Sequence, residues 1–390
     1  MVESAGTRGI DEVDDPVRST LESVSIRGFR SLREVEFPDI GRATVLVGAN
    51  GSGKSNFIRF FEMLNWMLRT HELQAFVAKH GGADDQLFGG SRNTPTMSAS
   101  ISLGTDRGRN DYSFTLAHGA DDQLYFADER WRFSPVGEAT EPRWLHAGSG
   151  HREAKIVAAA QGDIPELKPA TPRVVCHLLR NCATYQFHDT SDEAWIKKRW
   201  DISDRWHLRS HGGNLAAVLY RLQHEDVRRY ETICRQIRRV LPVFERFDIV
   251  DEHGRVLLRW KASDSGKTIG AHITSDGSLR FFALVTLLNL APEQLPDVLL
   301  LDEPELGLHP AAVALLGSMI KSVAVERQVV VATQSPLLVD AFGLDEVVVF
   351  ELEGGATTTR RLVSAEYKRW LADGFTTGEL WQTNLLGGRP

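Results

Sequence analysis

The chain contains 390 residues, of which 42% are hydrophobic and 25% are charged. This length fits one elaborated domain or two to three small ones, and the composition excludes a fibrous, collagen-like or wholly disordered chain. The 45 Lys and Arg residues are outnumbered by 52 Asp and Glu residues, which gives a net charge of −7. This charge excludes whole-molecule attraction to nucleic acid or to an anionic membrane, so any such contact requires a local basic patch.

The compartment is predicted from cysteine usage and from the N-terminus. Only Cys176, Cys182 and Cys234 are present, an odd and sparse set that favours a reducing cytosol over a disulfide-stapled secreted domain. No window approaches 18 uninterrupted apolar residues, and acidic residues occupy the positions where a signal peptide needs an apolar segment. We therefore expect a cytoplasmic protein without a membrane segment.

The chain begins with a segment without periodicity, residues 1–20, which is rich in acids, Gly, Ser and Thr and predicts a tail. Order is expected to begin near Leu21. Two alternating stretches up to Phe37 predict two strands, and the apolar run Ala43–Val47 predicts a buried third. Apolar residues at helical spacing over 56–68 predict a helix directly after the glycine-rich loop that follows this third strand.

That loop matches the pattern G-x-x-x-x-G-K-[ST] of the Walker A phosphate loop, and it lies in the expected context of strand, loop and helix. Glycines let backbone N–H groups converge on a phosphate, Lys54 reaches the β and γ oxygens, and Ser55 ligates Mg²⁺. The residues expected to bind the nucleotide here are Gly48, Ala49, Asn50, Gly51, Ser52, Gly53, Lys54, Ser55 and Asn56.

The middle of the chain is less informative about chemistry. Alternating residues over 97–133, broken by Gly and Asp turns, predict an antiparallel β lobe. Residues 135–172 contain five prolines and predict an irregular insertion. From Asn214, an expected N-cap, apolar residues at helical spacing continue to Leu241 and predict one long helix or a helical pair.

The last third contains three solid apolar runs, 298–301, 329–332 and 347–350, which are typical of central parallel strands buried on both faces. Asp302 and Glu303 follow the first run, at the carboxyl end of a strand, where α/β sheets place their ligands. This is the Walker B pattern. Asp302 would hold Mg²⁺ through water, and Glu303 would orient and deprotonate the attacking water.

Two further segments resemble a known family: residues 274–280 (Thr-Ser-Asp-Gly-Ser-Leu-Arg) before the Walker B pattern and residues 303–310 (Glu-Pro-Glu-Leu-Gly-Leu-His-Pro) after it. Together they are similar to the signature loop and D-loop of ABC-type ATPases of the RecF/SMC/OLD group. In that family the signature serine contacts the γ-phosphate of ATP bound to the other subunit. The resemblance therefore implies that Ser275 and Gly277 act in trans on ATP held by Lys54 of a second copy, in an ATP-dependent homodimer.

The resemblance implies four further candidate residues. Gln334 stands in the switch loop where many relatives carry a histidine; glutamine can hydrogen-bond a γ-phosphate or its water but cannot carry the imidazolium charge, so slow hydrolysis is expected. Arg30, in Gly28-Phe29-Arg30-Ser31, resembles a first-strand motif near the nucleotide, with a surface arginine as the alternative. Gln186 and His188 are both candidates for the Q-loop residue.

A row of arginines on the expected helix after Asn214 suggests double-stranded DNA as a partner. Steps of seven, seven and four keep them on one face, which could follow a phosphate backbone; they are Arg221, Arg228, Arg235 and Arg239. The alternative is a solvated face held by pairs such as Glu225–Arg229 and Glu231–Arg235.

The predicted fold class is α/β: a P-loop NTPase of the ABC-ATPase head type, with an antiparallel β lobe and a helical insertion lobe. The expected segments are a tail at 1–20, ATPase lobe I with Walker A and the β lobe at 21–134, an irregular and helical insertion at 135–265, ATPase lobe II with signature, Walker B, D-loop and switch at 266–350, and a C-terminal extension at 351–390.

The expected function is an ATPase that binds ATP and Mg²⁺, dimerises around two nucleotides, hydrolyses slowly and couples closure to DNA or a partner, in DNA repair or anti-phage defence. Catalytic roles are expected for Lys54, Ser275, Glu303 and Gln334. An effector of nuclease type would be a separate polypeptide. The alternatives are the nucleotide-binding subunit of a membrane transporter and a non-hydrolysing ATP-gated scaffold.

Overall fold

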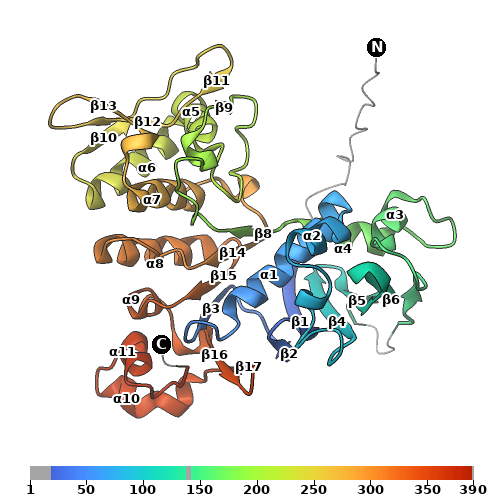
Figure 1. Ribbon diagram of the computed structural model, residues 1–390. Helices are drawn as coiled ribbons and strands as arrows, with labels where there is room; N and C mark the ends of the chain where they lie inside the picture. Colours follow the sequence, from blue (N-terminus) through green and yellow to red (C-terminus); the bar gives the residue numbers. More distant parts are fainter. Residues whose placement is uncertain (1–18, 138–141, 389–390) are drawn as a thin grey trace, which may run out of the picture.

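A six-stranded sheet whose inner strands are largely buried and apolar lies at the centre of the protein (Figure 1). The computed structural model describes residues 19–137 and 142–388, so the predicted tail lies outside the described residues except for Ser19 and Thr20, which begin β1. All neighbouring strands of the central sheet are parallel except β17. Its spatial order is β17 (Ala356–Arg361), β16 (Val347–Glu353), β3 (Ala43–Val47), β15 (Gln328–Thr333), β14 (Val298–Asp302) and β8 (Cys182–Tyr185).

The central sheet divides the hydrophobic interior into two cores. Successive side chains of a strand point to opposite faces, so Leu300 and Val330 enter one core while Leu299 and Val329 enter the other. Both faces are therefore apolar, which explains why these strands are continuous hydrophobic runs. The predictions of a buried strand at 43–47 and of parallel strands at 298–301, 329–332 and 347–350 are confirmed.

The first core lies between the central sheet and an antiparallel sheet. In spatial order the latter comprises β2 (Leu32–Phe37), β1 (Ser19–Phe29), β4 (Thr96–Thr105), β5 (Gly108–His118), β6 (Leu124–Pro135) and β7 (Leu145–His146). Helix α1 (Lys54–Asn65) packs between the two sheets, where Phe60 contacts Phe29 and Phe114. A π-helical turn (Trp66–Thr70) and α2 (Leu73–Lys79) continue the chain. The predicted β lobe is confirmed.

The second core joins the other face of the central sheet to a helical lobe. This lobe contains α5 (Leu215–Glu225), α6 (Val227–Val240), α7 (Asp276–Leu288) and α8 (Pro310–Ala324), the three-stranded sheet β10 (Phe244–Phe247), β12 (Arg259–Ala262) and β13 (Thr268–Gly270), and the pair β9 (Trp200–Asp201) and β11 (Arg255–Val256). The chain after Asn214 is thus a helical pair, because Asp226 leaves helical geometry and caps α6 with its side chain.

The segment 135–265 is not one structural unit. Helices α3 (Lys155–Gln161) and α4 (Ala170–Arg180) bury their apolar faces in the first core, beside the antiparallel sheet, whereas α5 and α6 bury theirs in the second. The expected boundary at residue 135 therefore does not separate the two lobes. Pro169 and Pro172 lie at the start of α4, where proline is compatible with a helix.

The C-terminal part packs against the edge of the central sheet that carries β16 and β17 (Figure 1). It contains α9 (Pro336–Val339), α10 (Lys368–Ala372) and α11 (Thr377–Gln382). Buried Trp381 donates to Gly388 O at 3.0 Å, and Glu351 accepts from Gly388 N at 2.8 Å. Within the residues that the structure describes, no helix is both long and apolar enough to cross a membrane.

Candidate functional site

The glycine-rich loop connects β3 to α1 and adopts a conformation that favours glycine. Gly51 and Gly53 have φ angles of 79° and 103°, in the left-handed region. A Cβ on Gly53 would lie 2.0 Å from Thr357 Oγ1, and one on Gly48 would lie 2.3 Å from Phe350 O. Larger residues are therefore excluded by space as well as by backbone strain.

The loop fits a phosphate group. Gly53, the N-cap of α1, provides no side-chain acceptor for the first turn, so the helix presents free N–H groups and the positive end of its dipole. Among the described residues, the buried hydroxyl of Ser52 has no hydrogen-bond partner. The Ser52 hydroxyl and the unpaired backbone amides are therefore available to donate hydrogen bonds to a bound phosphate.

Lys54 is buried and bends back over the loop. Its Nζ donates to Gly48 O at 2.7 Å and to Ala49 O at 3.0 Å. Burial lowers the pKa of Lys54 from its ordinary value, and the carboxylates of Glu303, Asp302 and Glu305 act in the opposite direction. The ammonium group is thus held near three acidic side chains at the carboxyl end of the central sheet.

Asp302 lies at the end of β14, beside the loop, and contacts three of the predicted residues. Its Oδ1 accepts from Ser55 Oγ at 3.3 Å, its Oδ2 accepts from Gln186 Nε2 at 2.6 Å, and its backbone oxygen is 3.1 Å from His188 Nε2. Burial raises the pKa of Asp302, and the hydrogen bond from Gln186 opposes this. Both Q-loop candidates therefore lie at the Walker B strand, and Gln186 is the one on the carboxylate.

Glu303 is paired with the switch residue. Gln334 Nε2 donates to Glu303 Oε1, and the Glu303 backbone N–H donates to Ala332 O at 2.8 Å. Glu303 follows directly after β14 and has a φ of 45°, an uncommon conformation for a non-glycine residue. The structure thus places the predicted base and the predicted switch side chain within one hydrogen bond.

Glu305 is a residue of this site that no separate signal in the sequence indicated. Its Oε1 accepts from Thr333 Oγ1 at 2.6 Å and from Gln334 N at 2.9 Å, and its buried Oε2 has no partner in the part of the chain that the structure describes. Burial raises the pKa of this carboxyl. Glu305 therefore fixes the backbone of the switch loop, and only the folded chain brings residues 305 and 334 together.

The predicted signature residues lie at the start of α7, away from the glycine-rich loop (Figure 1). Ser275 is exposed and caps α7 by accepting from Ser278 N at 3.3 Å. Gly277 packs on the D-loop, because a Cβ on it would lie 2.4 Å from Gly307 O. In the described structure the hydrogen bonds of the Ser275 hydroxyl go to Ser278 alone, so within one chain the signature does not join the loop site.

Arg280 is a second residue that sequence reasoning missed. Its guanidinium donates to Phe187 O at 3.1 Å, to His188 O at 2.9 Å and to Leu306 O at 3.2 Å. One side chain on α7 thus joins the Q-loop and the D-loop to the signature helix. Its position five residues after Ser275 is the only signal in the sequence.

Arg30 does not bond the loop in the described structure. Its Nε and Nη2 donate to Gln86 Oε1 at 3.1 and 3.0 Å. The neighbouring Ser31 contacts the site instead: its hydroxyl lies 2.8 Å from Thr357 Oγ1 and accepts from Asn56 Nδ2 at 2.8 Å. The first-strand motif therefore reaches the loop through Ser31.

The expectation that four arginines share one helix face is wrong. Arg221 belongs to α5 and is buried, with its Nε donating to Arg205 O at 3.0 Å and its guanidinium over the Trp206 ring. The other three are exposed on α6, across the break at Asp226, and they are Arg228, Arg235 and Arg239. The expected pairs also differ, since Arg229 pairs with Asp226 and Glu231 with Arg238.

The donor set around the loop fits Mg²⁺ bound together with phosphate. Ser55 and Asp302 supply one hydroxyl and one carboxylate, and Mg²⁺ is commonly held by one or two protein oxygens together with phosphates and water. Within 19–137 and 142–388, no group of three or more His, Cys, Asp or Glu residues could hold a metal ion by itself.

The chain is similar to known proteins in its sequence family and in its fold. The family described as "AAA domain, putative AbiEii toxin, Type IV TA system" matches residues 43–340. No curated protein sequence matches the chain. Among solved structures, an Smc head bound to the C-winged helix domain of ScpA is similar to it, with a TM-score of 0.56, 17% identity, and coverage of 90% of this chain and 99% of that one.

A second similar structure is the Smc head domain with an extended coiled coil bound to the C-terminal domain of ScpA, derived from Pyrococcus furiosus. It has a TM-score of 0.54 and 15% identity, with coverage of 91% of this chain and 99% of that one. At this identity the likeness shows the fold alone. The chain therefore belongs to the family "AAA domain, putative AbiEii toxin, Type IV TA system" and has the fold of ABC-type ATPase heads of the RecF/SMC class.

Proposed function

We propose that this protein is an ATPase that binds Mg²⁺ and ATP at the glycine-rich loop, hydrolyses ATP slowly and dimerises around two nucleotides. The observation that carries the proposal is the convergence of Lys54, Asp302 and Glu303 beside a loop with free amide groups. A phosphate loop, a metal-binding carboxylate and a second carboxylate for water are the parts that phosphoryl transfer to water requires.

Each side chain has a role in this proposal. Lys54 exchanges its two carbonyl acceptors for the β and γ oxygens of ATP, which a charged donor binds more strongly than it binds neutral carbonyls. Ser55 and Asp302 hold Mg²⁺, whose charge compensates that of the phosphates. Glu303 accepts a proton from the attacking water, and Gln186 holds Asp302 in place.

Slow turnover follows from the switch residue. Gln334 donates a hydrogen bond to one carboxylate oxygen of Glu303, the proposed base. Only the other carboxylate oxygen is then available to accept from the attacking water. A glutamine amide stays neutral, so it stabilises developing charge on the γ-phosphate less than an imidazolium would. The non-hydrolysing scaffold is the alternative that this same pair permits.

Dimerisation is supported by the surface around the signature. Ile273 and Leu306 are 68% and 42% exposed, and they flank the exposed Ser275 and the half-buried Gly277. Exposed apolar side chains beside polar ligand-binding groups are typical of an interface. A second copy placed here would add its Ser275 to the phosphates held by Lys54 and would cover Ile273.

Hydrolysis of radiolabelled ATP tests the proposal. We expect slow phosphate release by the wild type and none above background by Lys54→Ala or Glu303→Gln. Lys267→Ala and Glu366→Gln change exposed residues away from the loop and should retain wild-type rates. Equal rates for all five proteins would refute the proposed ATPase, and binding without hydrolysis by the wild type would favour the scaffold.

The cellular role is proposed from resemblance. Relatives of this fold suggest DNA repair or anti-phage defence with a separate effector, and the two Smc heads described above bind ScpA domains. A host challenged with phage should survive with the wild-type gene and not with Lys54→Ala.

For DNA, Arg228, Arg235 and Arg239 remain as a patch on α6, and any stimulation of ATPase activity by double-stranded DNA should fade as salt rises. A transporter subunit would instead fractionate with membranes.

A further inference from the structure

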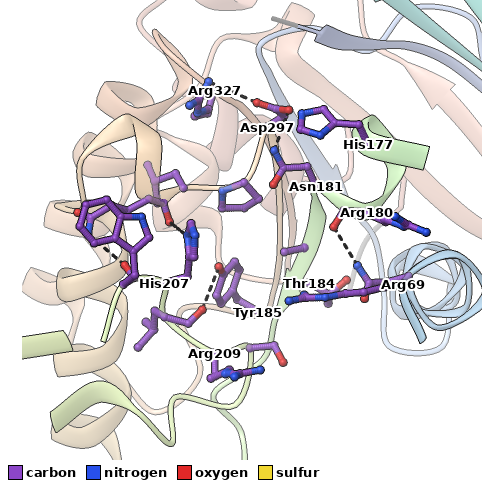
Figure 2. A pocket seen from close by; sticks show the side chains of 18 of the residues that line it. Arg69, His177, Arg180, Asn181, Thr184, Tyr185, His207, Arg209, Asp297 and Arg327 are labelled. Atoms are coloured by element: carbon purple, nitrogen blue, oxygen red, sulfur yellow. Dashed lines mark hydrogen bonds and ion pairs between the residues drawn. The ribbon is translucent and has the colours of Figure 1, made fainter. Parts of the chain in front are cut away.

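A cleft of ≈ 1820 Å³ lies beside the free edge of the central sheet (Figure 2). Its floor is strand β8 and the following Gln186. One wall is formed by the end of α1, the π-helical turn and α4, and the other by residues 203–211 and 292–297. This volume exceeds that of typical small-ligand pockets, which are about 300–1,000 Å³. The cleft is therefore large enough for a segment of a polymer.

The wall formed by the end of α1, the π-helical turn and α4 is basic. It presents Arg69, Arg173, His177 and Arg180 to the cleft, and its one acid, Glu62, is already paired with Arg59 at 3.2 Å. Figure 2 shows Arg69 and Arg180 together near Thr184, with His207 and Arg209 across the cleft. Arg69 is exposed, and within the part of the chain that the structure describes it pairs with no acidic group.

Other charges in the cleft are mostly compensated. Asp204 pairs with Arg209 at 2.9 Å, and Asp297 pairs with Arg327 at 3.4 Å. The remaining lining acids, Glu293 and Glu326, belong to segments outside the basic wall. Uncompensated positive charge is thus concentrated along the side of the cleft that adjoins β8.

Strand β8 offers unpaired backbone groups to this cleft. It pairs with β14 on one side and lies at the edge of the sheet on the other. Val298 N donates to Asn181 O, so in a parallel ladder the odd-numbered residues of β8 bond to β14 and the even-numbered residues face outward. The outward carbonyl of Cys182 already accepts from Asn65 Nδ2 at 3.4 Å, which leaves the N–H and C=O of Thr184 without a bonded neighbour in the described chain.

We propose that this cleft is the docking site for an extended acidic segment of a partner protein, which adds as a strand to the edge of β8 and places carboxylates against Arg69, Arg173 and Arg180. An edge strand offers N–H donors and C=O acceptors in alternation, and a peptide backbone has both a C=O to accept from the donors and an N–H to donate to the acceptors. The phosphates of a nucleic acid can use only the donors, so a peptide satisfies more of this surface. The basic wall then selects acidic side chains over neutral ones.

The site adjoins the nucleotide machinery. Thr184 lies on β8 two residues before Gln186, and Gln186 donates to Asp302 Oδ2 at 2.6 Å. A partner bound along β8 therefore contacts the strand that pairs with β14, whose last residue is the metal-binding Asp302. The inference goes beyond the proposed ATPase, and its test measures binding alone, so failure of one does not imply failure of the other.

The test measures binding of short labelled probes to the full chain by fluorescence anisotropy. The probes are a peptide of alternating Asp and Thr, a matching peptide of alternating Asn and Thr, and single-stranded oligo-dT of similar length. We expect the acidic peptide to bind at least about tenfold more tightly than the neutral one. Arg69→Glu should weaken it by about tenfold, the effect of roughly 1.4 kcal/mol, while Arg228→Glu on α6 should leave it unchanged.

A second pair of variants tests strand addition. Thr184→Pro removes the outward N–H without removing a bond to β14, because proline is tolerated on an edge, and it should abolish peptide binding. Thr184→Val keeps the backbone groups and should bind as the wild type. Binding of oligo-dT in preference to the acidic peptide, wild-type affinity in Arg69→Glu, or equal affinity in folded Thr184→Pro and Thr184→Val would each overturn the proposal. If Thr184→Pro does not fold, slowed amide exchange at Thr184 on peptide binding replaces it, and unchanged exchange overturns strand addition.

Discussion

Thr357 braces the glycine-rich loop from β17, outside the segment matched by the family, and its replacement by valine should weaken nucleotide binding. The side chain is 2% exposed, and its hydroxyl donates to Ser52 O at 2.9 Å and lies 2.8 Å from Ser31 Oγ. Valine has nearly the same shape but no hydroxyl. Ser52 O would lose its donor, and Ser31 would keep only its bond from Asn56.

The magnitude follows from the cost of an unsatisfied buried polar group, about 1–3 kcal/mol. If the whole cost falls on the loop conformation that binds phosphate, the dissociation constant for ATP rises by roughly 5- to 150-fold, at about 1.4 kcal/mol per factor of ten. Titration with a fluorescent ATP analogue measures this constant. Thr357→Ser keeps a hydroxyl and should recover much of the affinity.

Thr358→Val is the matched control, because Thr358 lies next along β17 and is less buried. Its affinity for the ATP analogue should equal that of the wild type. Thermal unfolding of both variants separates a local effect from general instability. The reasoning is refuted if Thr357→Val binds the analogue as tightly as Thr358→Val does.

Three further predictions follow from the same structure. Gly53→Ala should abolish ATP binding, because its Cβ would lie 2.0 Å from Thr357 Oγ1, whereas Gly51→Ala meets no atom within 4 Å and should show only the milder cost of a positive φ; equal binding by the two would contradict this. Arg280→Ala should lower the rate of ATP hydrolysis while leaving ATP affinity within about threefold, since it loses bonds to the Q-loop and D-loop and none to the glycine-rich loop. Loss of both hydrolysis and ATP affinity in Arg280→Ala, but not in the exposed control Arg239→Ala, would indicate a folding defect instead. The native protein should resist thiol reagents at pH 8, because burial raises the pKa of Cys176 to about 12 and of Cys234 to about 11. Both side chains therefore stay protonated well above the pH where a free cysteine ionises. Rapid labelling before denaturant is added would show that these residues are accessible.

The elements that could be predicted from sequence are those whose signal is local. The loop at residues 48–55 and the strand that ends at Asp302 each combine a short motif with an apolar run. The motif predicts the site, and the apolar run predicts the buried strand beside it. Gln186 also followed from its place at the end of a strand-like run, although the sequence left His188 as an equal candidate. The bond to Asp302 distinguishes them.

The residues that could not be predicted depend on contacts between distant segments. Thr357 lies 305 positions after Ser52, and Glu305 holds the switch loop 29 positions further along, so no periodicity or spacing connects them. The arginine row was misjudged because a seven-residue step assumes one continuous helix, and Asp226 breaks it. The boundary near residue 135 was misjudged because the prolines of 135–172 suggested irregular chain, whereas two of them lie at the start of α4.

In the proposed dimer, two copies of this chain close around two ATP molecules, with Ser275 of each acting on ATP held by Lys54 of the other. Light scattering of Glu303→Gln with ATP and Mg²⁺ tests it most directly, because this variant should bind ATP without consuming it. We expect twice the monomer mass with ATP, the monomer mass without nucleotide, and the monomer mass when Ser275→Arg is added to the same chain. A monomer in every nucleotide state, or a dimer that forms equally with and without ATP, would contradict it.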